Sequence, residues 1–145
     1  MASQNQTTRP PLRKPTFIKI DQLKPMTSGH TLTVKVVSSN TVLKRVGRTA
    51  VSPNVRNTRI AECIVGDETG TIIFTARNDQ VDLMKPGTTV ILRNAKIDMY
   101  KNTMRLAVDK WGRIEVTQPA NFNVHEDNNV SLVEYELVNV VEEGQ

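Results

Sequence analysis

Apolar and polar residues alternate along several short stretches of this chain, a pattern typical of β-strands that bury one face. From residue 31 onward, Leu32, Val34 and Val36 are apolar at every second position. The same pattern predicts further strands at residues 59–65, 71–77, 88–100 and 103–108, the last resuming at 113–116. The fourth of these is long enough to need a bend, which we expect at Asn94-Ala95.

Turn-forming residues separate these strands. The sequence Gly66-Asp67-Glu68-Thr69-Gly70 predicts a tight hairpin turn, in which the adjacent carboxylates serve the turn itself. Residues 78–84 predict one short helix, capped by Asn78 or Asp79 and ended by Lys85-Pro86-Gly87. Residues 44–56 contain Gly and Pro without a clear period, so we expect a long basic loop there.

Five strands with a short helix between the third and fourth match the strand plan of a five-stranded Greek-key barrel. Periodicity by itself indicates an all-β barrel or sandwich and does not choose the topology. We expect this domain to span residues 16–117, after a disordered basic arm at residues 1–15 that is rich in Gln, Thr, Asn and Pro. Residues 118–145 form an acidic tail, with apolar positions at 130–140 that predict an extra strand or a partner-docking segment.

Charge is distributed unevenly along the chain. Residues 1–15 carry three basic residues and no acidic one, and residues 16–117 carry sixteen basic and nine acidic residues, a net charge of +7. Residues 118–145 carry six acidic residues and no Lys or Arg. A basic domain beside an acidic tail indicates a polyanionic partner. It also suggests that the tail competes with this polyanion for the basic face, as an alternative to the strand or docking segment.

The residues needed for a metal or catalytic site are scarce. With two histidines and one cysteine, Cys63, the chain cannot assemble a Cys/His zinc site, and Cys63 lies in an apolar run typical of a buried side chain. No phosphate-binding glycine loop or Ser/His/Asp grouping is present. We therefore expect no catalytic residues, no metal and no cofactor.

Targeting signals are equally sparse. No stretch approaches the roughly 18 apolar residues of a transmembrane helix, and residues 1–15 lack the apolar core of a secretory signal. We expect no membrane partner and a location in the nucleus and/or cytoplasm, although the basic arm is also compatible with a transit peptide.

Three motifs in order resemble a known family. The first is Val65-Gly66-Asp67-Glu68-Thr69-Gly70, the second Leu83-Met84-Lys85-Pro86-Gly87-Thr88-Thr89-Val90-Ile91-Leu92, and the third Met99-Tyr100-Lys101-Asn102-Thr103-Met104-Arg105-Leu106. Together they resemble the OB-fold single-stranded-DNA-binding proteins of the SOSS-complex and replication protein A group, and residues 78–114 look closer still to plant single-domain OB-fold proteins.

The resemblance implies a groove on the open face, where bases stack on aromatic side chains and basic side chains follow the phosphates. Tyr100 keeps the family's aromatic at the end of the fourth strand, whereas Arg77 stands in place of a stacking Trp, and Lys96 and Ala107 replace further aromatics. Trp111 either caps the barrel or stacks on nucleic acid.

Strand alternation places five side chains on one basic outward face: Lys35, Arg77, Lys96, Tyr100 and Arg105. With the basic loop and the following turn, the expected binding residues are Lys35, Lys44, Arg45, Arg48, Arg56, Arg77, Lys96, Tyr100, Lys101 and Arg105.

These observations lead us to expect a protein that binds single-stranded DNA or RNA without catalysis, with DNA favoured over RNA. An OB barrel does not fix its ligand. The alternative is a protein-interaction adaptor in a larger complex, for which the acidic C-terminal tail offers a place to bind protein partners.

Overall fold

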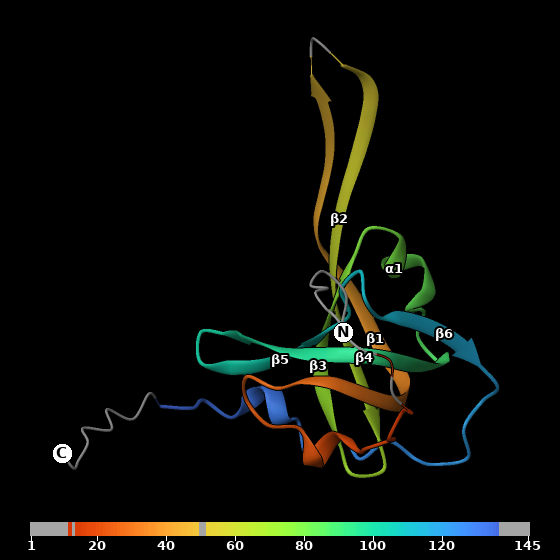
Figure 1. The fold of residues 1–145 in the computed structure, drawn as a ribbon, viewed down its shortest axis with the longest axis vertical. Coiled ribbons are helices and arrows are strands. Elements are labelled where there is room, and N and C mark those ends of the chain that lie inside the picture. The colour runs from red at the N-terminus through yellow and green to blue at the C-terminus, as the bar shows by residue number, and fades with distance from the viewer. Residues whose placement is uncertain (1–11, 13, 50–51, 137–145) are drawn as a thin grey trace, which may run out of the picture.

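In the computed structural model, which describes residues 12, 14–49 and 52–136, the strands form one sheet that closes into a barrel (Figure 1). The strands are β1 (Ser28–Thr49), β2 (Ser52–Asp67), β3 (Gly70–Arg77), β4 (Thr89–Tyr100), β5 (Thr103–Ala107) and β6 (Arg113–Thr117). Their order is β1-β2-β3-β5-β4-β6, and pairing of β1 with β4 closes the barrel. This arrangement confirms the expected all-β, five-stranded OB barrel, because β6 is the predicted resumption of the fifth strand.

Short helices accompany the barrel. Helix α1 (Asp79–Leu83) lies between β3 and β4 as predicted, and the 3-10 helices η1 (Ile20–Gln22) and η2 (Val130–Leu132) precede and follow the strands. Asn78 occupies the N-cap position of α1 without capping it through its side chain. Instead, Asn78 Oδ1 accepts a hydrogen bond from the backbone N–H of Arg59 at 3.2 Å, which joins the start of the helix to β2.

Strand β4 bends where the sequence predicts. Asn94 has a φ of 54°, a left-handed conformation that asparagine adopts more readily than most residues. Up to Arg93 the strand pairs with β6, and from Lys96 onward it pairs with β5. The bend therefore allows one edge of β4 to pair with β6 and then with β5, while the other edge pairs with β1.

The core consists of every second strand residue, as the alternation predicts. Among the buried side chains are Leu32, Val34, Val36, Ala61, Cys63, Val65, Ile72, Phe74, Val90, Leu92 and Leu106. Full burial of one such aliphatic or aromatic side chain larger than alanine contributes about 1.5–3 kcal/mol. Cys63 is fully buried, as the sequence predicted, and this burial raises the pKa of its thiol.

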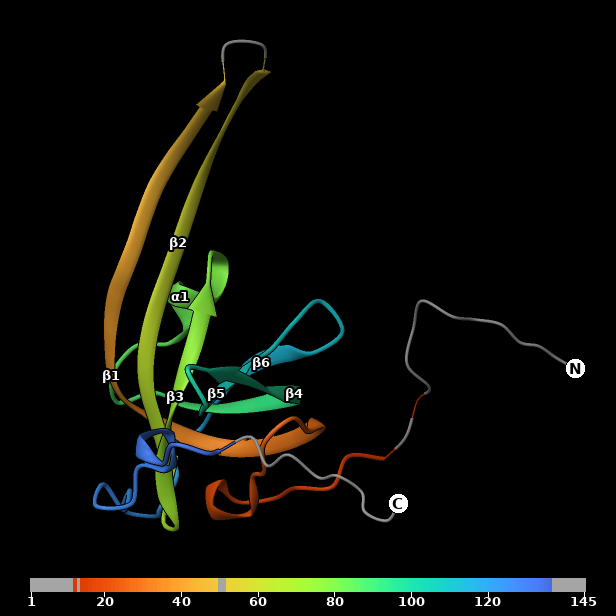
Figure 2. The same ribbon diagram turned by 90° about the vertical axis from the view of Figure 1, so that its left-hand side faces the viewer.

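The predicted loop at residues 44–56 is wrong. Strand β1 continues to Thr49 and β2 begins at Ser52, and the two remain paired, with Lys44 opposite Arg59 and Gly47 opposite Arg56. Register shifts between residues 41 and 43 and between 47 and 49 interrupt the two-residue period, which explains why the sequence pattern concealed these strands. The paired residues 41–49 and 52–59, hereafter the β1–β2 arm, project beyond the barrel (Figure 2).

The β2–β3 turn is organised by Asp67, whose side chain is fully buried. Asp67 Oδ1 accepts hydrogen bonds from the backbone N–H of Thr69 at 2.8 Å and from its hydroxyl at 2.6 Å. Asp67 Oδ2 accepts a third from the backbone N–H of Ile20 at 3.0 Å. The predicted turn chemistry is confirmed for Asp67, whose carboxylate also ties the segment preceding β1 to the barrel. The Glu68 carboxylate instead pairs with Lys19 Nζ at 2.8 Å.

The described part of the acidic tail, residues 118–136, crosses the outside of the barrel and is hereafter the C-terminal strap. Its backbone reaches the β2–β3 turn, where the N–H of His125 donates to Asp67 O at 2.9 Å and Asn128 O accepts from the N–H of Thr71 at 2.8 Å. Farther along, the buried Ser131 hydroxyl donates to Met104 O at 2.5 Å and accepts from the N–H of Ile73 at 2.9 Å. The strap therefore forms part of the folded domain.

The strand expected at residues 130–140 is wrong for its described part. Residues 130–132 form the 3-10 helix η2, because the side chain of Asn129 accepts a hydrogen bond from the N–H of Ser131 and turns the chain. Residues 137–140 lie outside the described residues, as does most of the expected disordered arm at residues 1–15. The expected competition between the tail and nucleic acid stays a prediction.

In the part of the chain that the structure describes, no helix is long and apolar enough to cross a membrane.

Candidate nucleic-acid interface

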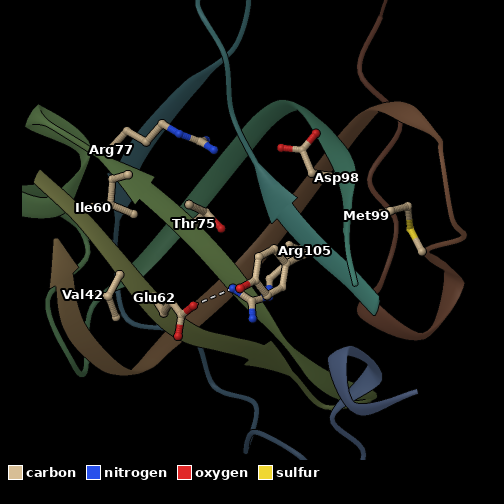
Figure 3. A pocket seen from close by; sticks show the side chains of 9 residues that line it. Val42, Ile60, Glu62, Thr75, Arg77, Asp98, Met99 and Arg105 are labelled. Carbon is tan, nitrogen blue, oxygen red and sulfur yellow. Dashed lines mark hydrogen bonds and ion pairs between the residues drawn. The ribbon is translucent and has the colours of Figure 1, made fainter. Parts of the chain in front are cut away.

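A groove with a volume of about 400 Å³ lies on the outer face of the barrel, between the base of the β1–β2 arm and the β4–β5 hairpin (Figure 3). It is lined by Val42, Ile60, Glu62, Thr75, Arg77, Asp98, Met99, Tyr100 and Arg105. Strand alternation explains much of this lining, since Ile60 and Glu62 flank the buried Ala61 and point away from the core.

Arg105 is held at the centre of the groove by two neighbours. Its Nη1 donates to Glu62 Oε2 at 2.6 Å, and its guanidinium carbon lies 4.5 Å from the centre of the Tyr100 ring. The Arg105 side chain is 16 % exposed, whereas Tyr100 is 49 % exposed. A guanidinium at this distance stacks on the aromatic face. The contact supports one side of the Tyr100 ring, and Lys101 Nζ also lies over this ring, at 5.4 Å.

A second carboxylate, that of Asp98, lies beside the same arginine. Asp98 pairs directly with Arg105 across β4 and β5, and its Oδ1 is 3.6 Å from Lys96 Nζ. The charged lining thus consists of two arginines, including Arg77, and the two carboxylates of Asp98 and Glu62. Beside the basic residues expected on the outward face, the groove lining therefore contains carboxylates equal in number to its guanidinium groups.

The structure brings together part of the predicted site. Arg77, Tyr100 and Arg105 line the groove. Lys101, in the β4–β5 turn, places its Nζ 5.4 Å from the Tyr100 ring, at the edge of the groove. These four positions are where the sequence interpretation and the geometry agree.

Other predicted residues lie elsewhere. Lys35 contacts the C-terminal strap, with Nζ 3.5 Å from Phe122 O and 5.8 Å from the Phe122 ring, so it does not join the groove. Lys96 pairs with Asp98 and does not line the groove itself. The backbones of Lys44, Arg45, Arg48 and Arg56 lie in the β1–β2 arm, and their side chains fall outside the described residues.

Sequence reasoning missed several lining residues, above all Glu62 and Asp98. The available signal was the alternation that singled out Arg77, because Glu62 also lies between two core positions, Ala61 and Cys63. An anionic ligand predicts basic and aromatic side chains at its site, so the acidic side chains on the same face were not expected to bind it.

One ion pair joins β2 to α1 next to the groove residue Ile60. Arg59 Nη1 and Nη2 donate to the two carboxylate oxygens of Asp82 at 2.9 and 3.0 Å. The hydrogen bonds from Arg59 lower the pKa of the Asp82 carboxyl. Gln80 accepts from the N–H of Arg77 at 3.1 Å and donates to Val108 O at 2.8 Å, which positions the backbone of Arg77 beside the groove.

Several known proteins are similar to this chain in sequence and in fold. A family model described as single-stranded DNA binding protein Ssb-like, OB fold, matches residues 23–116. The uncharacterized protein At4g28440 of Arabidopsis thaliana is 64 % identical over 132 residues, covering 88 % of this chain and 86 % of that protein. The solution structure of the hypothetical protein F20O9.120, also from Arabidopsis thaliana, is 58 % identical with a TM-score of 0.72, covering 97 % of this chain and 99 % of that one.

A more distant structure extends the likeness of the fold. The second OB-fold domain of replication protein A from Methanococcus maripaludis matches with a TM-score of 0.52 at 20 % identity, covering 72 % of this chain and 98 % of that domain. The resemblance inferred from the three sequence motifs is confirmed. The match at residues 23–116 spans β1 to β6 and nearly the whole barrel. The chain therefore belongs to the Ssb-like family of OB-fold single-stranded DNA binding proteins.

Proposed function

We propose that this protein binds single-stranded nucleic acid in the groove between the β1–β2 arm and the β4–β5 hairpin, with DNA preferred over RNA and without catalysis. The observation that carries the proposal is the half-exposed ring of Tyr100, supported from one side by Arg105. A base stacked on such a ring contributes about 1–3 kcal/mol, and only unpaired bases expose their faces in this way. The family's description, which names single-stranded DNA, favours DNA over RNA.

The distribution of charge suggests how a strand would lie. The charged groove lining has as many carboxylates as guanidinium groups, so it offers little net attraction for phosphates. Residues 44–57 of the β1–β2 arm carry four basic residues and no acidic one, and Lys101 adds a cation at the opposite edge. We therefore place the bases in the groove and the phosphates along the arm and the β4–β5 turn, where cations neutralise them.

Fluorescence anisotropy with labelled oligonucleotides tests the proposal. The probes are single-stranded DNA, RNA of the same sequence and the corresponding duplex, each at about 50 and about 200 mM salt, since phosphate contacts weaken with salt. We expect single strands to bind more tightly than duplex, DNA more tightly than RNA, and Tyr100→Ala to weaken binding by about 5- to 100-fold.

Trp111→Ala is the matched control. Trp111 is 40 % exposed and has a lysine, Lys110, 5.1 Å from its ring, yet it does not line the groove. Its substitution should leave the affinity within about twofold, in keeping with the small effects of surface changes. Absence of binding at low salt would overturn the proposal, and an equal loss in the two variants would place the site elsewhere.

The adaptor function is favoured by a different feature, the exposed apolar end of the C-terminal strap. Leu132 is 77 % exposed, and the adjacent Val133 is half-exposed. We expect cross-linking in extracts of the native source to join this segment to a defined partner, and Leu132→Ser/Val133→Ser to abolish the cross-links. Unchanged cross-links in that variant would exclude this segment as a docking site.

A further inference from the structure

The groove contains two carboxylates whose presence a purely phosphate-binding surface does not explain. Glu62 lies on β2 and Asp98 on β4, on either side of Arg105 (Figure 3). Their side chains are 37 % and 39 % exposed. Both carboxylates repel phosphates, so a strand bound here must present some other group to them.

Each carboxylate retains acceptor capacity. Glu62 Oε2 accepts from Arg105, whereas Oε1 has no hydrogen bond to any residue that the structure describes. Asp98 interacts with Lys96 through one oxygen at 3.6 Å, beyond hydrogen-bond distance, and makes no hydrogen bond within the described ranges. An ionised carboxylate is an acceptor only. The groove therefore offers acceptors to a ligand that brings its own donors.

We propose that Glu62 and Asp98 make the groove selective for bases with hydrogen-bond donors on their Watson–Crick edge, guanine above all, and unfavourable for thymine and uracil. This inference rests on the proposed binding of single strands in the groove. Guanine presents N1–H and the N2 amino group side by side, which matches the two oxygens of one carboxylate. Cytosine and adenine each present one amino group, and acidic side chains accept from such groups.

Thymine and uracil present mainly acceptors on their Watson–Crick edge. Their single N3–H donor lies between two carbonyl oxygens, whose partial negative charges repel a carboxylate. Stacking on Tyr100 is insensitive to this difference, because every base has an aromatic face. Selectivity is therefore expected to depend on Glu62 and Asp98, and overall affinity on Tyr100.

The test compares single strands of about 12 nucleotides, a length within the range covered by one OB fold. One probe is oligo-dT, one is a repeat of T-T-G, and one is the same repeat with inosine in place of guanine. Isolated guanines avoid four-stranded structures. We expect the guanine repeat to bind about 5- to 20-fold more tightly than oligo-dT. Inosine, which keeps N1–H and lacks the 2-amino group, should fall between them.

The variant Glu62→Gln/Asp98→Asn keeps the shape of both side chains and removes their charge. We expect its guanine-to-thymine affinity ratio to fall toward one, while its affinity for oligo-dT rises because two negative charges are lost. Glu126→Gln, an exposed carboxylate on the C-terminal strap, is the control and should keep the wild-type ratio.

The outcomes separate the two proposals. Equal affinity of the wild-type protein for the three probes would overturn the selectivity and leave the proposed function standing. A guanine preference that persists in Glu62→Gln/Asp98→Asn would show that other groups read the base. Absence of binding to every probe would overturn the selectivity and the proposed function together.

Discussion

Strand β2 carries two carboxylates, Asp67 at its end and Glu62 within it, and the structure surrounds them very differently. Asp67 is fully buried and accepts three hydrogen bonds, two from Thr69 and one from Ile20. Glu62 is partly exposed, and one of its carboxylate oxygens accepts a hydrogen bond from Arg105. Buried polar groups stabilise a fold only when they are satisfied. The comparison separates a carboxylate that holds the barrel together from one that remains available to a ligand.

The same contrast extends to the regions around the two residues. Near Asp67, backbone groups of the C-terminal strap join the β2–β3 turn, through His125 and Asn128. Around Glu62, the contacts are ion pairs between side chains that solvent reaches. Exposed ion pairs contribute little to stability, typically about 0–1 kcal/mol. Substitutions near the turn should therefore affect folding, and substitutions in the groove should affect binding.

The largest effect on stability is expected for Asp67→Ala. Loss of the carboxylate removes three hydrogen bonds and leaves the N–H of Ile20 without its partner, so the free energy of unfolding should fall by about 3 kcal/mol. Chemical denaturation provides the measurement. Glu68→Ala in the same turn removes only an exposed ion pair with Lys19 and should cost less than about 1 kcal/mol. Equal losses would remove the distinction between buried and exposed carboxylates.

An intermediate effect is expected for Ser131→Ala in the C-terminal strap. The buried hydroxyl bridges Ile73 and Met104, and its loss leaves two backbone groups unpaired, at a cost of about 1–3 kcal/mol. Thermal or chemical unfolding measures the change, with Ser38→Ala at an exposed position of β1 as the control, expected within about 0.5 kcal/mol of wild type. A neutral Ser131→Ala would mean that the strap is not an integral part of the domain.

The smallest effect is a pH dependence at the groove's edge. Because Arg59 lowers the pKa of Asp82, this pair stabilises the fold above the carboxyl's unfolded pKa of about 3.9, and the contribution is lost as pH falls through the lower folded pKa. In Arg59→Gln, the carboxyl pKa measured by NMR titration should rise toward its usual value. An unchanged pKa would show that the ion pair does not form in solution.

Much of the barrel was predictable from sequence because burial imposes a two-residue period. That period identified Leu32 as core and placed Arg77 and Tyr100 on the outside, and Asn94 marked the bend. The β1–β2 arm was missed because bulges at residues 41–43 and 47–49 break the period. The strap was missed because it is held by backbone hydrogen bonds, the Ser131 hydroxyl and scattered apolar side chains such as Val130 and Tyr135, which leave no periodic signal.

The site was only partly predictable for a different reason. Alternation assigns a side chain to the outer face but does not say what it meets there, as Lys35 shows by contacting Phe122 instead of the groove. Glu62 satisfied the same alternation as Arg77, and only the three-dimensional neighbourhood of Arg105 made it a candidate.

The central claim, that single strands bind in the groove, is tested most directly by mapping amide chemical shifts in the ¹⁵N-labelled protein as single-stranded DNA is added. We predict that the shifts cluster at Glu62, Thr75, Arg77, Tyr100 and Arg105, while Lys35, Asn128 and Ser131, which lie at or under the strap, stay in place. Shifts centred on Lys35 and the strap, with the groove unchanged, would contradict the account.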